Sequence, residues 1–149
     1  MDIIPAIDIK NGKVVKALSG KREFYTPICK HYNKSSNPLI FINGLIKKYK
    51  PSIIYIADID SIAGDKNNFN IIELISKKYP NLNIWLDSGN VYNVPYKRKN
   101  INPILCSEKC NRIININYKY KEHIHSYDYT KNLVGESNFK SLASKYKNK

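Results

Sequence analysis

The sequence predicts an α/β fold built on a parallel sheet. Short apolar runs, typical of buried strands, return along the chain at intervals long enough to hold a helix. Acidic side chains stand at or just after the ends of these runs. The C-terminal edge of a parallel sheet is where such folds place their ligand sites. At 149 residues and 42% hydrophobic residues, the chain is long enough for one domain with a core of its own.

The first predicted strand covers residues 2–9. The turn signal Asn11-Gly12 follows it, and residues 13–18 can return as the second arm of a small hairpin. Asn37-Pro38 then begins a helix with apolar residues at helical spacing, which ends in lysines before Pro51.

Further strands are predicted at 53–60, 83–87, 102–106 and 123–129, with a second helix over 70–79. The segment 91–100 contains Pro95 and a basic run, so its helix is expected to be short or missing.

The net charge of +13 suggests a nucleic-acid partner, but the kind of basic residue argues against one. Only three of the 25 basic residues are arginines, at positions 22, 98 and 112. Base readout and phosphate clamps favour arginine, because its planar fork matches those acceptors. We therefore expect a generally basic surface, and nucleic-acid binding is disfavoured.

Neither a metal site nor a membrane segment is predicted. Cys106 and Cys110 form a C-x3-C pair without a second pair, so the three cysteines, with Cys29, are expected to be reduced thiols. No apolar run approaches the length of a membrane span, and residues 1–10 do not resemble a signal peptide. We expect a soluble, cytoplasmic protein.

Several polar residues are predicted to gather at the C-terminal strand ends. For Asp60, Ser107 and Glu108, helix capping or solvation is the favoured interpretation. The full set is Asp8, Asp58, Asp60, Asp87, Glu108 and Asp128, with Ser88, Gly89 and Ser107.

The segment Ile4-Pro-Ala-Ile-Asp-Ile-Lys-Asn-Gly-Lys-Val-Val15 resembles the opening of the phosphoribosylformimino-AICAR-ribotide isomerase of histidine biosynthesis and of its cyclase sister. A second block, Tyr55-Ile-Ala-Asp-Ile-Asp60 followed by Gly64, resembles the second strand of that family. A combination of four blocks looks closer still to isomerase-related proteins of one-carbon-metabolising microbes: Gly20-Lys-Arg-Glu-Phe-Tyr-Thr-Pro27, Tyr55 to Ala63, Trp85-Leu-Asp-Ser-Gly89 and Pro103-Ile-Leu-Cys-Ser-Glu108. The resemblance covers roughly residues 2–140.

The resemblance implies a partial (β/α)8 barrel of about five βα units over residues 1–140, with the last three units missing, and a basic tail over 141–149. It implies that Asp8 and Asp128 act as general base and general acid in an Amadori-type aldose-to-ketose isomerisation, without a cofactor. Arg22, Ser88, Gly89 and Ser107 are the expected contacts to a small phosphorylated sugar or cofactor precursor.

Three departures from the family pattern change this expectation. One is the turn after the fourth strand, which is Gly-Thr in the family and Cys106-Ser107 here. The family holds one phosphate on a glycine-rich turn after its third strand, and here that turn begins with an acid, Asp87. The second phosphate site lies between the last two strands of the family, which have no counterpart here. A substrate with two phosphates is therefore doubtful.

Two classes of function remain open at this stage. In the first, the chain is an isomerase that needs a second chain, either another copy of itself or a complementary half-barrel, because five strands do not close an eight-stranded barrel. In the second, it is a catalytically inactive barrel fragment that acts as a binding or partner module, or the product of an interrupted gene.

Overall fold

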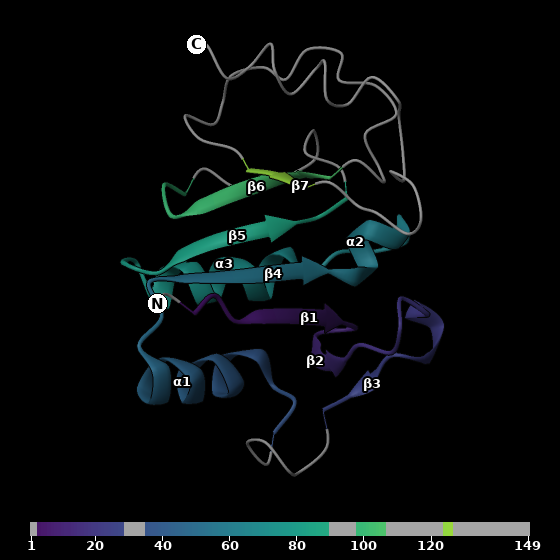
Figure 1. Cartoon of the computed structure of the whole chain (residues 1–149), viewed down its shortest axis with the longest axis horizontal. Helices are drawn as coiled ribbons and strands as arrows, with labels where there is room; N and C mark the ends of the chain where they lie inside the picture. The colour runs from purple at the N-terminus through teal and green to yellow at the C-terminus, as the bar shows by residue number, and fades with distance from the viewer. Residues whose placement is uncertain (1–2, 29–34, 90–97, 107–123, 127–149) are drawn as a thin grey trace.

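The computed structural model describes residues 3–28, 35–89, 98–106 and 124–126 of the chain (Figure 1). Its elements, in chain order, are β1 (Ala6–Lys10), β2 (Lys13–Lys16), the 3-10 helix η1 (Arg22–Phe24), β3 (Thr26–Pro27), α1 (Pro38–Tyr49), β4 (Ile53–Asp58), α2 (Ile59–Ala63), α3 (Phe69–Lys78), β5 (Asn83–Asp87), β6 (Ile101–Cys106) and β7 (Ile124–Ser126).

These strands form one sheet in the order β3-β2-β1-β4-β5-β6-β7. The neighbours β1, β4, β5, β6 and β7 pair in parallel, whereas β2 and β3 are antiparallel additions beside β1. Five parallel strands in sequence order, with α1 and α3 in two of the connections, confirm the α/β prediction. They are the arrangement of part of a (β/α)8 barrel.

The β1–β2 hairpin forms where the sequence predicts it. Asn11 and Gly12 both have positive φ, at 50° and 70°. This is the backbone of a tight hairpin turn, which favours an Asn-Gly pair. The turn aligns Lys10 with Lys13 and Ile9 with Val14.

Helix α1 begins and ends as predicted. The side chain of Asn37 accepts hydrogen bonds from the amides of Leu39 and Ile40, at 3.0 and 3.3 Å, and Pro38 occupies the first turn. Lys50 adopts the left-handed conformation that ends the helix, at φ 47°, and Pro51 follows. Helix α3 is displaced by one residue at each end from the predicted 70–79.

The predicted strand over 53–60 is two residues too long. It ends at Asp58, whose Oδ1 accepts a hydrogen bond of 3.1 Å from the amide of Ser61 and caps α2. Gly64, at φ 91°, closes that short helix. The carboxylate stabilises a helical turn where the apolar pattern alone suggests continued strand.

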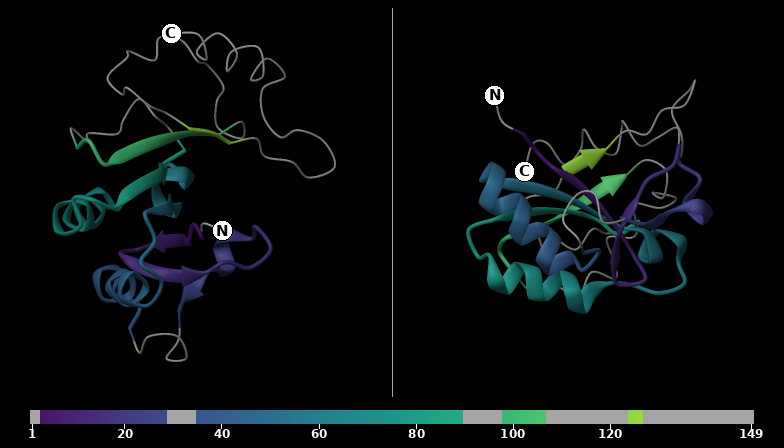
Figure 2. Two further views of the ribbon diagram at one scale, coloured as in Figure 1. Left: turned by 60° about the vertical axis from the view of Figure 1, so that its left-hand side comes forward. Right: turned by 90° about the horizontal axis from the view of Figure 1, so that it is seen from below.

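The main core lies between the sheet and the two longer helices. Its members are fully or almost fully buried, and those from the strands alternate with residues of the opposite face. Figure 2 shows α1 and α3 side by side on one side of the sheet. A barrel wall carries its helices on the outside only, and α1 and α3 follow that arrangement. The strand and helix residues of this core include Ile7, Ile9, Ile54, Ile56, Ile84 and Leu86 with Ile42, Ile72 and Ile75.

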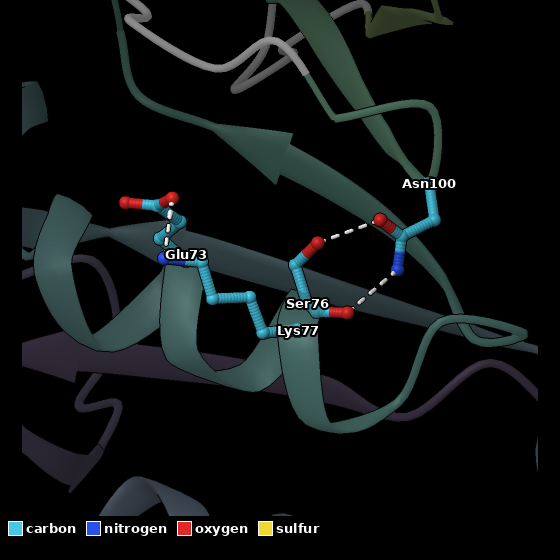
Figure 3. A network of polar contacts seen from close by, with 4 residues as sticks. All are labelled: Glu73, Ser76, Lys77 and Asn100. Carbon is cyan, nitrogen blue, oxygen red and sulfur yellow. Dashed lines mark hydrogen bonds and ion pairs between the residues drawn. The ribbon is translucent and has the colours of Figure 1, made fainter.

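Asn100 joins the end of α3 to the sheet at the N-terminal edge of the strands (Figure 3). Its side-chain oxygen accepts a hydrogen bond of 2.6 Å from the buried hydroxyl of Ser76. Its amide group donates to the carbonyl oxygens of Ser76, Tyr79 and Leu82, at 3.1 to 3.3 Å. One side chain thus pairs with three carbonyl groups in and just after the last turn of α3, of which that of Tyr79 also accepts from the Leu82 amide at 3.1 Å. The same view shows the Glu73–Lys77 ion pair on the surface of α3.

Candidate functional site

The face of the sheet opposite α1 and α3 brings two acids to the C-terminal strand ends. Asp8 of β1 is in register with Ala57 of β4, and Ala57 is in register with Asp87 of β5. Residues in register on parallel strands share a face, and two strand spacings separate Asp8 from Asp87 by about 10 Å between Cα atoms. Asp8 therefore lies at the edge where the sequence predicts the site.

Asp8 is half-buried, and its surroundings disfavour its charged form. Burial raises the pKa of its carboxyl above the ordinary value, the Arg22 guanidinium lowers it, and the Asp87 carboxylate raises it further. Burial is the largest of these effects, so the pKa of Asp8 is raised overall.

Arg22 lies in η1, in the segment that follows the β1–β2 hairpin. The ammonium group of Lys10 donates a hydrogen bond of 2.8 Å to the carbonyl oxygen of Arg22, which ties η1 to the end of β1. The positive charge of Arg22 lowers the pKa of Asp8 in part. The role of Arg22 as an anion contact stays a prediction.

Asp87 is almost fully buried, and among the described residues its carboxylate accepts hydrogen bonds from three parts of the chain. The Tyr55 hydroxyl donates to Oδ2 at 3.1 Å, and the Gly89 amide donates to Oδ1 at 2.9 Å. The Cys106 thiol, with its sulfur 3.8 Å from Oδ1, is the third donor. The strands β4, β5 and β6 are thus connected through one carboxylate.

Ser88 and Gly89 form the turn that follows β5. The carbonyl oxygen of Ser88, a buried residue, accepts a hydrogen bond of 2.8 Å from the Ser61 hydroxyl. Gly89 has φ 69°, and a Cβ atom added there would lie 2.9 Å from the Cα atom of Ile62. The turn therefore packs directly against α2, and only glycine fits at position 89 without displacing the backbone.

Tyr55 and Cys106 are the site residues that sequence reasoning missed. Both belong to motifs quoted for the family resemblance, but the sequence pattern assigns neither side chain a role at the site. Burial, followed by the Asp87 carboxylate, strongly raises the pKa of Tyr55, so its hydroxyl stays protonated and donates. Period-two alternation places Tyr55 on the same face as Ala57, and this was the available signal.

Two other acids at this edge serve the structure. Asp58 is buried and accepts hydrogen bonds from the amide and the side chain of Asn68, at 2.7 and 2.6 Å. Burial raises its pKa, and the hydrogen bonds from Asn68 lower it in part. Asp60 accepts from the amide of Asn11 at 2.6 Å and from Asn68 at 2.8 Å.

Asn68 completes this network, since its side-chain oxygen accepts from the Gly12 amide at 2.8 Å. The network therefore holds the β1–β2 turn against β4 and α3. Asp60 has a structural role, although as an acceptor for the hairpin turn and not as a helix cap.

The remaining predicted site residues, Asp128 and Ser107, lie outside the described residues, as does the predicted tail over 141–149. In the part of the chain that the structure describes, no three His, Cys, Asp or Glu side chains are grouped as metal ligands. No helix in those same ranges is long and apolar enough to cross a membrane.

Comparison with known proteins agrees with this architecture. The family described as "Histidine biosynthesis protein" matches residues 2–98. A relative from Methanocaldococcus jannaschii, named "Uncharacterized protein MJ0703", is 43% identical over 75 residues, which are 50% of this chain and 33% of that protein. The chain thus aligns with about one third of this relative's length. With the family match covering residues 2–98 and the parallel sheet in place, the chain belongs to the histidine biosynthesis protein family of (β/α)8 barrels.

Proposed function

We propose that the chain carries the general base of an acid/base isomerase, related to the phosphoribosyl isomerase of histidine biosynthesis, that acts on a small phosphorylated sugar or cofactor precursor. The observation that supports this most is the environment of Asp8. This carboxylate lies in β1, two residues before the strand ends at Lys10 and in line with Asp87 at the end of β5. It is half-buried, and its pKa is raised by burial and by Asp87 and lowered in part by Arg22. A raised pKa makes a carboxylate a better proton acceptor at neutral pH.

In the proposed reaction, Asp8 removes the proton from C2 of the ring-opened sugar, and the electron pair of that C–H bond forms the enol or enolamine. Reprotonation at C1 then yields the ketose product. Asp128 is the acid that we propose for ring opening. Arg22 binds the substrate phosphate, since it is the cation that acts on Asp8 in this part of the sheet edge.

The test measures exchange of the C2 proton of ribose 5-phosphate, a sugar with a single phosphate, in heavy water by NMR. The Asp8→Asn variant is expected to lose at least 100-fold in exchange rate, because the amide cannot accept the proton. Asp65→Asn, at an exposed acid in the segment between α2 and α3, is the matched control and should keep the wild-type rate.

Equal exchange by wild type and Asp8→Asn would overturn the assignment of the base. A folded wild-type protein that neither exchanges the proton of ribose 5-phosphate nor binds that compound would overturn the enzyme proposal, and the binding-module alternative would take its place.

A further inference from the structure

We propose that Asp87 is a specificity-determining residue: a built-in anion that excludes a phosphate group from the turn after β5 and restricts the site to ligands whose group at this end is uncharged or cationic. This inference names the ligand class of the site proposed above and rests on the location of that site, but not on its reaction.

The first argument concerns hydrogen-bond donors. A turn binds phosphate through backbone amides and hydroxyls that point toward the ligand. Here the Gly89 amide donates to Asp87 Oδ1 at 2.9 Å, and the Tyr55 hydroxyl donates to Oδ2 at 3.1 Å. Two donors that would suit a phosphate at the end of β5 thus already serve the protein's own carboxylate.

The second argument concerns charge. Asp87 is 9% exposed, so solvent screens its carboxylate poorly from anything bound at the adjoining turn. The Asp87 carboxylate on β5 already raises the pKa of Asp8 on β1, although β4 lies between these two strands. A phosphate dianion at Gly89 would be closer to Asp87 than Asp8 is, and it would be repelled more strongly.

The third argument is that the turn has little freedom to rearrange. Gly89 approaches Ile62 so closely that a Cβ atom would lie 2.9 Å from the Ile62 Cα atom, and Ser61 binds the carbonyl oxygen of Ser88. The Gly89 amide therefore does not turn away from Asp87 toward a ligand without disturbing α2.

These features make the edge electrically asymmetric. Arg22 acts on Asp8 at the β1 end, whereas Asp87 stands at the β5 end. A ligand that matches both ends carries one phosphate, bound toward Arg22, and a hydroxyl or amine group toward Asp87. In this proposal Ser88 and Gly89 shape the turn and do not bind phosphate.

The experiment titrates the full-length protein with inorganic phosphate and follows backbone amide resonances by NMR at about 0.15 M salt, which screens the lysine-rich surface. In the wild type, the Gly89 amide should not shift. In Asp87→Ala, which removes the acceptor, it should shift, and phosphate should bind at least 10-fold more tightly. Asp87→Asn removes the charge but keeps an acceptor, so a smaller gain is expected. Asp65→Asn makes the same charge change at an exposed position and should show no gain.

Circular dichroism checks that each variant is folded. If Asp87→Ala does not fold, the comparison is made between the wild type and Asp87→Asn. A wild-type Gly89 amide that shifts with phosphate would overturn the proposal. Wild-type phosphate affinity in the folded variants would overturn it as well. The C2 exchange assay depends on Asp8 and this titration on Asp87, so either proposal can fail without the other.

Discussion

The hydroxyl of Tyr55 donates a hydrogen bond of 3.1 Å to Oδ2 of Asp87 and thereby joins β4 to β5 on the face that carries Asp8. These two residues are 32 positions apart in the sequence. After burial, the Asp87 carboxylate is the next largest cause of the strongly raised pKa of Tyr55. This carboxylate is the one that we propose as the specificity determinant. The bond also provides the first quantitative test of the site.

Tyr55→Phe removes the donor and leaves the buried Asp87 carboxylate with one partner fewer. We expect a loss of about 1.5–3 kcal/mol in the free energy of unfolding, the range for bonds to charged groups. Tyr79→Phe is the matched control, because its hydroxyl donates at the same 3.1 Å to the neutral side chain of Asn43. That variant should lose only about 0.5–1.5 kcal/mol. Urea denaturation measures both, and equal losses would contradict a charged acceptor at Asp87.

Asp8→Asn should change the pH dependence of stability. Because the pKa of Asp8 is raised on folding, the folded protein binds a proton more tightly than the unfolded chain. The contribution of Asp8 to the free energy of unfolding therefore falls as the pH rises from the ordinary pKa of an aspartate through the raised pKa of Asp8. The variant lacks this term, so its stability relative to wild type should be highest near pH 7 and should decline as the pH is lowered.

Unfolding midpoints measured between pH 3 and 7 check this prediction. Glu73→Gln serves as the opposite control, since the hydrogen bond from Lys77 lowers the pKa of Glu73. The stabilisation that Glu73 provides is present above the ordinary pKa of a glutamate and is lost as the pH falls. The stability of Glu73→Gln relative to wild type should therefore rise as the pH is lowered, opposite to that of Asp8→Asn. A relative stability of Asp8→Asn that does not vary with pH would contradict the burial of its charge.

Asn100→Ala removes three donated hydrogen bonds and the acceptor of the Ser76 hydroxyl. We expect a loss of about 2–4 kcal/mol, because carbonyl groups at the end of α3 and a buried hydroxyl lose their partner. The control is Asn102→Ala, whose side chain makes an exposed contact of 3.4 Å with Asn83 and should cost about 0.5 kcal/mol or less. Similar losses by thermal or urea denaturation would show that the Asn100 network contributes little.

Gly89→Ala tests how closely the turn after β5 approaches α2. Gly12→Ala is the matched control, because Gly12 has almost the same φ, 70° against 69°, but no atom within 4 Å of an added Cβ. The control should cost about 1 kcal/mol from backbone strain alone. Gly89→Ala should cost about 1–3 kcal/mol more, since Ile62 must move. Equal costs in urea denaturation would mean that the turn has room to adjust.

Local signals predicted most of the described elements. Asn11-Gly12 specifies a tight turn, and Asn37-Pro38 with Pro51 bounds α1, because capping and proline effects act within a few residues. The end of β4 was placed two residues late. Ile59 extends the apolar pattern of β4 past Asp58, whereas in the structure the Ser61 amide donates a hydrogen bond to the Asp58 side chain and the chain turns into α2.

The sequence by itself determined the order of strands and helices and the position of Asp8 at a strand end, since hydrophobic periodicity and turn chemistry are local. Only the tertiary structure decided what surrounds Asp87, because Tyr55 and Cys106 reach it from neighbouring strands, 32 and 19 positions away. It likewise gave Asp60 its structural partner, the Asn11 amide 49 positions away. Strand pairing brings such residues together, and no spacing along the chain records which carboxylate accepts which donor.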